Sequence, residues 1–430
     1  MGSSVSSPAC PADGSQSDVH DGDAHRCDRG VTPRPHVVVL MATGRLGGAE
    51  RSMVSLIKSS TAALRYTLLL PEDGELGQVA VAAGADALVV PWPRRVIALG
   101  ERSGLPHPTA LLRAAPAFWS AVGRVAAEIQ SLRPDIFVTN GIKPHVIGSL
   151  ALRTFQGLPL VWYLRDSLEG RRLSRAIIRR VSGRCDAAIA ISKYVARDAT
   201  TYLPPAVRPE VIHNIVNVPL ERECHDEPIE KPDGELWFAT IGALTPLKGH
   251  DVFLKAAAIV SRERPEARFL IVGSNQYAPE QRMDYAGRLR ALASRLQLDP
   301  VVHFLGQRRD VPRLLRQIDV VVQCNTAPEA FGRSVAEAMS AGLPVIASRA
   351  WSFPDLIEDG RSGWLVPPGD VDALADRMST AAIDPGMRRD IGERARASIA
   401  SITGAPGSAA AFEAVLTRAA RRRSQVSASP

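Results

Sequence analysis

The strongest constraint on the fold is a series of short, wholly apolar segments that alternate with amphipathic stretches. HVVVLMA (residues 36–42) precedes the helix-like AERSMVSLIKSS, and further apolar segments follow in YTLLLP, DALVVPW, DIFVTN, PLVWYLR and AAIAIS. Strands that are apolar on both faces, each followed by a helix, are typical of a mostly parallel sheet covered by helices.

A second series of the same kind begins at Leu236. LWFATIGA is followed by ARFLIVGS, VVHFLG, DVVVQCN, LPVIAS and GWLVP, again with helix-like stretches between them. With 430 residues, of which 45% are hydrophobic, the chain is long enough for two domains. We therefore predict an α/β protein of two doubly wound, Rossmann-like domains that face each other across a cleft, where the ligand would bind.

The boundary between the domains is predicted at residues 224–234, CHDEPIEKPDG, which are rich in charge and poor in apolar side chains. Beyond the second domain, Met387, Ile391, Ala395 and Ile399 recur at helical spacing. The expected division is a disordered tail (1–33), an N-terminal acceptor-side domain (34–223), a linker (224–234), a C-terminal nucleotide-sugar-binding domain (235–384), and C-terminal helices with a tail (385–430).

Composition favours a cytoplasmic protein. No apolar run approaches the roughly 20 residues that span a bilayer, and residues 1–33 lack the apolar core of a secretory signal. The five cysteines are scattered and form no C-x-x-C pair, which fits a reduced compartment and argues against a metal or disulfide framework.

The net charge of +7 comes mostly from arginine, notably in RRLSRAIIRR (171–180) and RAARRR (418–423). Such runs are usually solvated helix faces, and the alternative is contact with an anionic membrane surface or a phosphorylated ligand. We expect no nucleic-acid partner, and a peripheral membrane contact through residues 171–180 stays open.

A glycine-rich turn, TGRLGGAE (43–50), follows the first apolar segment. Glycines there let backbone N–H groups approach a phosphate, and the helix that follows favours negative charge at its start. The spacing of Gly44, Gly47 and Gly48 is not G-x-G-x-x-G, which argues against a nicotinamide-dependent enzyme. An anion site and a plain tight turn both remain open.

The corresponding turn of the second series is TIGALTPLKGHDVFL (240–254). The pattern predicts a strand that ends at Ala243 and a helix that begins near Asp251. Lys248 lies in the loop between them, where its ammonium group is placed either to meet a diphosphate or simply to be solvated.

PEAFGRSVAEAMSAG (328–342) lies between two predicted strands. Glu329 falls in a loop, and Glu337 falls inside a helix predicted over about residues 334–340. Carboxylates suit bidentate hydrogen bonding to vicinal hydroxyls of a sugar or a ribose. The structural alternative is a capping box between Ser334 and Glu337.

In these segments the chain resembles the family 4 retaining glycosyltransferases of the GT-B fold, over about residues 36–400. The most specific element is the E-x7-E motif, EAFGRSVAEAMSAGLPVIAS, with Glu329 and Glu337 as its acids. The other matching pieces are GGAE (47–50), VIHNIVN (211–217), LTPLKG (244–249) and LIEDGRSGWLVPPGD (356–370).

The resemblance implies catalytic roles for Glu329 and Lys248. Lys248 would neutralise the donor diphosphate, Glu337 would bind the ribose hydroxyls, and Glu329 would hold the sugar being transferred. The further donor-binding residues that it implies are Gly47, Gly48, Phe331, Gly332, Arg333 and Ser334. A departing nucleoside diphosphate builds negative charge that fixed donors must stabilise, so no metal or other cofactor is expected.

One residue departs from the family pattern. The family commonly has an arginine in a G-R-L sequence before the lysine loop, whereas this chain has Ala243. Either Lys248 provides the charge alone or another arginine, such as Arg333, reaches in; a non-catalytic protein is the third alternative. The D-x-D sequences at 21–23 and 370–372 are poor metal candidates, and the second is expected to cap a helix.

Acceptor-side residues are predicted after two N-terminal strands. Asn140, Lys143 and His145 follow one strand, and Arg165 and Asp166 follow the next. We interpret His145 as a structurally satisfied histidine rather than a catalyst, so the sequence names no general base. His213 and Asn214 are likewise interpreted as a strand-end turn.

The predicted function is retaining transfer of a hexose or N-acetylhexosamine, such as N-acetylglucosamine, from a UDP-linked donor. The expected acceptor is a small sugar-containing molecule of the aminoglycoside type, as in antibiotic biosynthesis. The alternatives are synthesis of a cell-surface polysaccharide or lipid-linked glycan, and an inactive sugar-nucleotide-binding protein.

Overall fold

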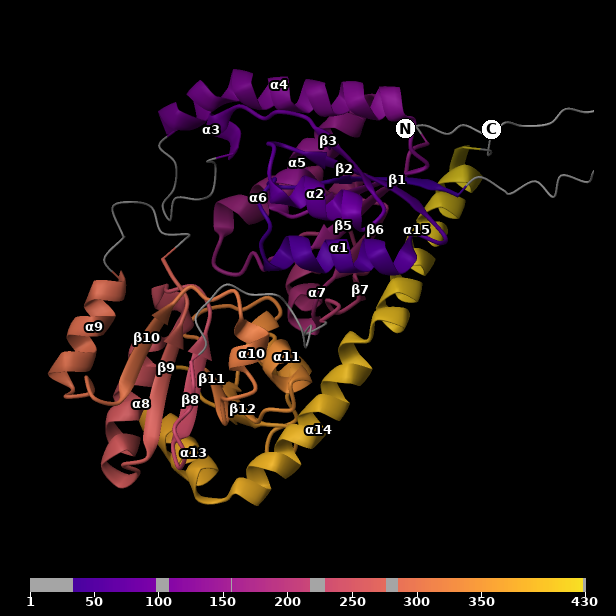
Figure 1. The fold of residues 1–430 in the computed structure, drawn as a ribbon. Helices are drawn as coiled ribbons and strands as arrows, with labels where there is room; N and C mark the ends of the chain where they lie inside the picture. Colours follow the sequence, from indigo (N-terminus) through magenta and orange to yellow (C-terminus); the bar gives the residue numbers. More distant parts are fainter. Residues whose placement is uncertain (1–33, 98–107, 156, 217–228, 276–284, 428–430) are drawn as a thin grey trace, which may run out of the picture. The chain divides into compact units, whose positions relative to one another are not determined.

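The computed structural model describes residues 34–97, 108–155, 157–216, 229–275 and 285–427 (Figure 1). Residues 34–430 belong to one compact unit. The tail predicted over 1–33 and residues 224–228 of the predicted linker lie outside the described residues.

The first sheet has seven parallel strands in the order β3-β2-β1-β4-β5-β6-β7. Its strands are β1 (His36–Leu40), β2 (Arg65–Leu70), β3 (Asp86–Val89), β4 (Ile136–Asn140), β5 (Leu160–Leu164), β6 (Ala187–Ala190) and β7 (Glu210–Val211). Every residue of β1, β4 and β5 is buried, which is why these segments lack polar alternation. The helices of this half are α1 (Gly48–Ser60), α2 (Glu75–Ala82), α3 (Arg94–Ile97), α4 (Pro108–Leu132), α5 (Ile142–Ala151), α6 (Arg172–Val181) and α7 (Lys193–Ala199).

The second sheet has six parallel strands in the order β10-β9-β8-β11-β12-β13. Its strands are β8 (Leu236–Ile241), β9 (Ala267–Val272), β10 (Val302–Gly306), β11 (Val320–Gln323), β12 (Val345–Ser348) and β13 (Trp364–Val366). Its helices are α8 (His250–Glu263), α9 (Tyr285–Arg295), α10 (Val311–Leu314), α11 (Arg333–Ser340), α12 (Phe353–Leu356) and α13 (Val371–Ile383). The two doubly wound sheets confirm the predicted fold class.

Each sheet reverses its strand order once. In the first sheet the reversal lies between β1 and β4, and in the second it lies between β8 and β11. At such a point the loops after the two central strands leave in opposite directions, so a crevice opens beyond their carboxyl ends. The glycine turn follows β1, the Lys248 loop follows β8 and the Glu329 loop follows β11.

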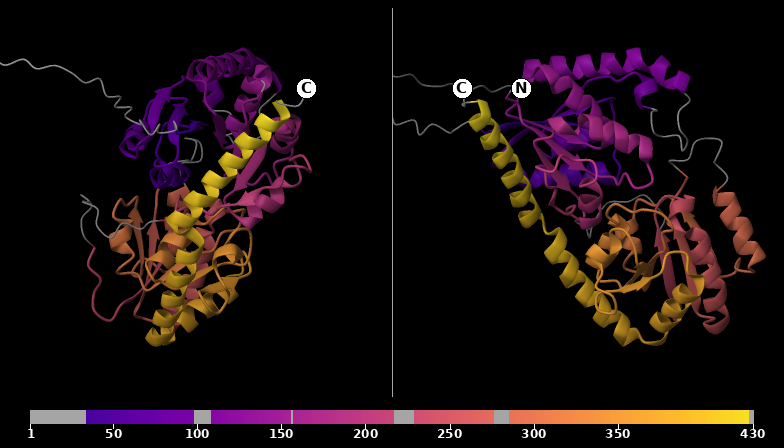
Figure 2. Two further views of the ribbon diagram at one scale, coloured as in Figure 1. Left: turned by 90° about the vertical axis from the view of Figure 1, so that its right-hand side faces the viewer. Right: turned by 180° about the vertical axis from the view of Figure 1, so that it is seen from behind.

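Two helices end the chain. α14 (Pro385–Thr403) packs against α11, and α15 (Ala405–Ser427) packs against α1 and the strands β4, β5 and β6 (Figure 2). Ile391, Ala395 and Ile399 are buried on α14, so the predicted helical spacing is confirmed. On α15, Phe412 is buried, with its ring 5.8 Å from that of Tyr163 in β5.

One described stretch, Pro385–Arg421, is long and apolar enough to cross a membrane by length and composition. Charged residues are sparse in part of this stretch. Core helices of proteins without membrane spans share this length and composition.

Candidate active site

The loop that holds Lys248 is shaped by the glycine that follows it. β8 ends at Ile241, two residues before the predicted end, and a single 3-10 turn at Pro246–Lys248 leads into Gly249. Gly249 has φ +69°, and a Cβ there would lie 1.9 Å from the carbonyl oxygen of Cys324. Only glycine lets the start of α8 approach the end of β11 so closely, so Lys248 is held beside the Glu329 loop.

Glu329 is held by three donors. The Lys248 ammonium donates to its Oε2, the Asn325 side-chain amide donates to the same oxygen at 3.2 Å, and the Gly332 N–H donates to Oε1 at 3.3 Å. Burial pushes the pKa of Glu329 upward, but the Lys248 charge and these hydrogen bonds outweigh it and hold the pKa below its usual range. The carboxylate is therefore ionised at neutral pH.

The Glu329 loop closes at Gly332, which has φ +84°. A Cβ at this position would lie 2.7 Å from a ring carbon of Phe353 on α12. Gly332 is consequently the N-cap of α11, which begins at Arg333. Phe331, on the other side of Gly332, is buried with its ring 6.1 Å from that of His213.

The capping box between Ser334 and Glu337 does not form, and that alternative was wrong. With Gly332 as N-cap, Ser334 is the second helical residue, and its hydroxyl donates to Gln323 Oε1 at 3.1 Å. Glu337 is the fifth, too far along the helix to reach the cap. Instead, Arg333 Nε donates to Glu337 Oε1 at 2.7 Å.

Arg333 also connects the E-x7-E segment to the glycine turn. Its Nη1 donates to the Gly48 carbonyl at 3.0 Å and to the Ser52 hydroxyl at 3.2 Å. A Cβ on Gly48 would lie 3.3 Å from Arg333 Cδ, so a side chain there would crowd the arginine. Arg333 therefore reaches the glycine turn, and its pairing with a donor diphosphate stays a prediction.

The glycine turn itself ends in a helix start. Gly47 is the N-cap of α1, and its N–H donates to Glu50 Oε2 at 3.1 Å. One N–H of the turn is thus already occupied by a carboxylate of the same helix.

Two predicted acceptor-side residues, Asn140 and Lys143, lie at the end of β4 and on the first turn of α5. The Asn140 amide nitrogen donates to the Met41 sulfur at 3.4 Å, whereas its Oδ1 is buried without a partner. The Lys143 ammonium donates to the carbonyl of Ile97 at the end of α3. Lys143 therefore joins two helices.

His145 belongs to the core. Its ring stacks on Trp162 with 4.7 Å between centroids, and its Nδ1 shares a 2.7 Å hydrogen bond with the Thr139 hydroxyl. Burial lowers its pKa to about 3, so the imidazole is neutral at physiological pH. This environment is that of a structural histidine. The His213 Nδ1 lies 3.0 Å from the Ile191 carbonyl, so this histidine is bound to backbone.

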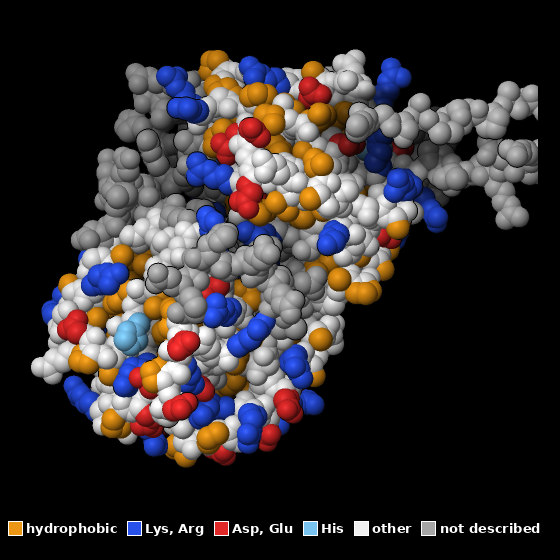
Figure 3. Space-filling model, in the orientation of Figure 1, with side chains coloured by type: hydrophobic (Ala, Val, Ile, Leu, Met, Phe, Trp, Pro, Cys, Tyr) orange, Lys and Arg blue, Asp and Glu red, His pale blue; other side chains and the backbone are white. Residues whose placement is uncertain are grey.

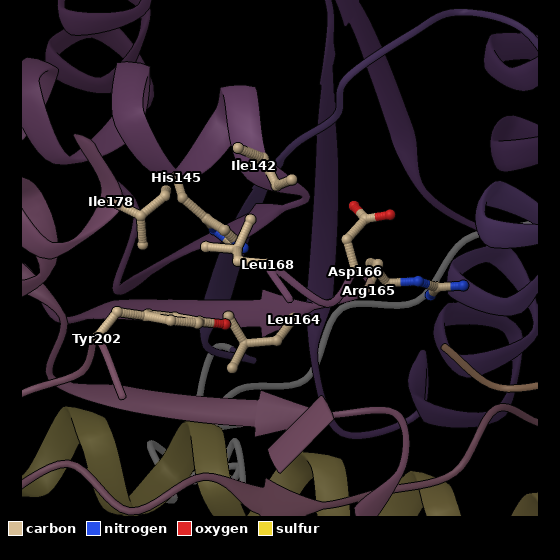
Figure 4. A pocket seen from close by; sticks show the side chains of 8 residues that line it. All are labelled: Ile142, His145, Leu164, Arg165, Asp166, Leu168, Ile178 and Tyr202. Carbon is tan, nitrogen blue, oxygen red and sulfur yellow. The ribbon is translucent and has the colours of Figure 1, made fainter. Parts of the chain in front are cut away.

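Arg165 and Asp166 follow β5 and line a small cavity (Figure 4). Its volume is about 10 Å³, which is room for one water molecule. In Figure 4 the Arg165 guanidinium and the Asp166 carboxylate point in different directions, and neither points toward His145 or Tyr202. This cavity is too small for a sugar.

Asn325 and Ser192 were not predicted from the sequence as residues of the site. Asn325 supports Glu329 and accepts a 2.9 Å hydrogen bond from the Gln323 side chain. The Ser192 hydroxyl donates to the Ala330 carbonyl at 2.6 Å. A polar residue two positions after a buried strand is the signal for Asn325, whereas nothing local points to Ser192.

Among the residues that the structure describes, no group of three or more His, Cys, Asp or Glu side chains could hold a metal ion. Asp370, from the second D-x-D sequence, is the N-cap of α13 and accepts a 2.9 Å hydrogen bond from the Ala373 N–H, which confirms the predicted cap. The sequence at 21–23 lies outside the described residues.

The basic segment 171–180 forms most of α6. Leu173 and Ile177 are exposed on it, and Arg175 is paired with Asp198 at 2.7 Å. On the face shown in Figure 3, basic and acidic side chains are interspersed. A membrane contact through this helix stays a prediction.

Comparison with known proteins settles the family. The model described as Glycosyltransferase Family 4 matches residues 46–219, and the model described as Glycosyl transferases group 1 matches residues 221–398. The chain belongs to glycosyltransferase family 4. These two stretches together include residues 46–50 of the glycine turn, the Lys248 loop and the E-x7-E segment of this family 4 chain.

Solved structures agree on the fold. HepE from Anabaena, in complex with UDP and glucose, superposes with a TM-score of 0.73 at 23% identity and covers 90% of this chain and 100% of its own. Sucrose-phosphate synthase from Thermosynechococcus elongatus gives 0.72 at 18% identity, with 90% and 99% covered. At these identities the likeness shows the GT-B fold alone.

Curated relatives of the family 4 chain match over a shorter length. A D-inositol 3-phosphate glycosyltransferase of Streptomyces scabiei is 35% identical over 189 residues, 41% of this chain and 40% of the relative. The N-acetyl-alpha-D-glucosaminyl L-malate synthase of Bacillus anthracis is 34% identical over 108 residues, 25% and 28% of the two chains. The match spans about two-fifths or less of these relatives.

Proposed function

We propose that this family 4 chain transfers a hexose or N-acetylhexosamine from a UDP-linked donor to a hydroxyl of a small polar acceptor, with retention of the anomeric configuration. The observation that supports this most is the grouping of Lys248, Glu329, Arg333 and Glu337 beyond β8 and β11, where the second sheet reverses its strand order. Doubly wound sheets bind their ligands at such a point.

Donor binding would replace the ion pairs that Lys248 and Arg333 now form with Glu329 and Glu337. Lys248 is paired with Glu329, and Arg333 with Glu337, so both acids and both cations are already held near the crevice. A diphosphate would take over the two cations, while ribose and sugar hydroxyls would take over Glu337 and Glu329. The complexes of HepE with UDP and with UDP-glucose support a UDP-linked donor for this chain.

The proposed chemistry occurs on one face of the sugar. The acceptor oxygen forms a bond to the anomeric carbon on the side from which the diphosphate departs, the bond between that carbon and the phosphate oxygen breaks, and the acceptor proton passes to the departing phosphate oxygen. Lys248 and Arg333 would stabilise the charge that develops on the leaving group. No side-chain base is assigned, since His145 is buried in the core.

A small acceptor is supported by the relatives. Their names state transfer involving inositol 3-phosphate and malate, both of which are small polar molecules with a hydroxyl group. The aminoglycoside-type product, the glycan or lipid-linked alternative and the cytoplasmic location stay predictions.

The test is a donor and acceptor screen with the purified full chain. UDP-glucose and UDP-N-acetylglucosamine are incubated with mixed hydroxyl acceptors, products are found by mass spectrometry, and the anomer is assigned by NMR. We expect a product with the donor's anomeric configuration. An inverted anomer, or hydrolysis of the donor alone, would contradict the proposal, and UDP binding without transfer would favour the inactive sugar-nucleotide-binding protein.

A further inference from the structure

The guanidinium of Arg165 is buried and only partly paired: the Asp166 charge interacts with it, but two of its nitrogens lack hydrogen bonds. The residue is 8% exposed, and its Nε and Nη1 have no hydrogen-bond partner. The neighbouring carboxylate of Asp166 points elsewhere (Figure 4). The guanidinium of Arg165 lies over the Tyr163 ring, with 5.0 Å between Cζ and the ring centroid. A buried cation is costly unless a partner completes it, and a cation–π contact does not provide an anion.

A second unpaired polar atom lies on the neighbouring strand. Asn140 ends β4 and is 4% exposed, with its Oδ1 buried and unpartnered. In the parallel register Asn140 is opposite Tyr163, and Arg165, the first residue after β5, places its guanidinium over the Tyr163 ring. Both residues therefore lie at the carboxyl edge of the first sheet, at the ends of neighbouring strands.

Their place in the fold points to a ligand. β4 borders the strand-order reversal of the first sheet, and β5 is its next neighbour. Ligands bind beyond the carboxyl ends of strands near this point. A guanidinium can donate two parallel hydrogen bonds to a phosphate or a carboxylate. The Asn140 Oδ1 can accept a hydrogen bond from a hydroxyl.

We propose that Arg165 binds an oxyanion on the acceptor, a phosphate monoester or a carboxylate, and that Asn140 Oδ1 accepts a hydrogen bond from an acceptor hydroxyl. The inference rests on the proposed function, because it names the class of acceptor for that reaction. The acceptors are then anionic sugars, polyols or hydroxy acids, and the neutral forms of the same molecules are poor substrates.

Binding is measured first, so that the inference does not depend on turnover. The full chain is saturated with UDP, which fills the donor site, and is titrated with glucose 6-phosphate, glucuronate and glucose by ligand-observed NMR. We expect the two anions to bind and glucose to bind at least about tenfold more weakly, as expected for the loss of a charge-assisted hydrogen bond. Phosphate and carboxylate preference is read from the first two ligands.

Three variants assign the site. Arg165→Gln removes the charge, and the expected result is loss of the preference for anions with UDP affinity unchanged. Arg165→Lys keeps the charge but not the two parallel N–H donors, and should retain part of the preference for anions. Arg184→Gln removes an arginine that pairs with Asp186 before β6, and serves as the control with unchanged preference. Thermal unfolding checks that each variant is folded.

The outcomes separate the two proposals. Equal binding of glucose and the two anions, or an unchanged preference in Arg165→Gln, overturns the anion site even if transfer occurs. Weakened UDP binding in Arg165→Gln also overturns it, because Arg165 would then belong to the donor site. Absence of UDP binding in the wild-type chain contradicts the proposed function, and the same titration without UDP then decides the anion site.

Discussion

Lys248 and Glu329, 81 positions apart in the sequence, form an ion pair at the reversal of the second sheet. The pair exists because Gly249 brings the start of α8 against the end of β11. Each group is therefore compensated before any donor arrives. In the proposed function a donor would break this pair, and its diphosphate and sugar hydroxyls would engage Lys248 and Glu329 together.

The two acids of the E-x7-E segment are expected to differ in their effects. Glu337→Gln should raise the dissociation constant of UDP about tenfold, because a carboxylate that would hold the ribose hydroxyls becomes a neutral amide. Glu329→Gln should lower kcat, because this acid would hold the sugar, and should not weaken UDP binding, because it releases Lys248 from its ion pair. Calorimetric titration with UDP and initial rates measure both. Equal effects of the two variants on UDP affinity would contradict the separate roles.

Glu329 should also make stability depend on pH. The pKa of Glu329 in the folded chain is lowered. In the unfolded chain the pKa of a glutamate is about 4.3. Its charged form therefore stabilises the fold above that pH, and the stabilisation is lost as the pH falls through the folded-state pKa. Urea unfolding between pH 5 and 3 should show a steeper loss in the wild type than in Glu329→Gln. Parallel losses would argue against a depressed pKa.

His145 should remain neutral in the folded chain. Burial lowers its pKa to about 3, against about 6.5 in the unfolded chain, so the unfolded state binds the extra proton first. Stability should therefore fall as the pH drops below about 6.5, and His145→Phe should lose less on the same change. Imidazole NMR signals, assigned by comparison with that variant, measure the pKa directly. A His145 titration near pH 6.5 would be inconsistent with its buried position.

The glycine before α8 should be indispensable for the Lys248 loop. Gly249 and Gly306 have nearly equal φ values, +69° and +67°, but only at Gly249 would a Cβ meet another atom, the Cys324 oxygen at 1.9 Å. Gly306→Ala should cost about 1–2 kcal/mol of unfolding free energy, which is the left-handed penalty alone. Gly249→Ala should cost more and weaken UDP binding. Urea unfolding and calorimetry compare the two, and equal costs would show that the close contact does not matter.

Most strands could be predicted from the sequence, because wholly apolar segments are buried on both faces in a parallel sheet. The helix cap at Asp370 followed from local chemistry as well. The capping box at Ser334 failed because the cap position is set by the left-handed Gly332, whose conformation depends on packing against Phe353 on another helix.

Contacts between distant segments could not be predicted from the sequence. The Arg333–Gly48 hydrogen bond joins residues 285 positions apart, and no local pattern specifies it. The same holds for the buried state of Arg165, since a strand-end arginine has the same sequence pattern whether it is solvated or buried. Residue types indicated the candidate donor site, whereas tertiary packing decides which charges are paired.

The most direct test of the donor site is calorimetric titration of UDP into Lys248→Ala, with Lys255→Ala as the control. Lys255 has the same charge and forms an exposed pair with Asp251 on α8. Loss of a charge-assisted contact to the diphosphate should raise the UDP dissociation constant about tenfold to hundredfold in Lys248→Ala and leave it unchanged in Lys255→Ala. Wild-type UDP affinity in Lys248→Ala would contradict a donor site at this point.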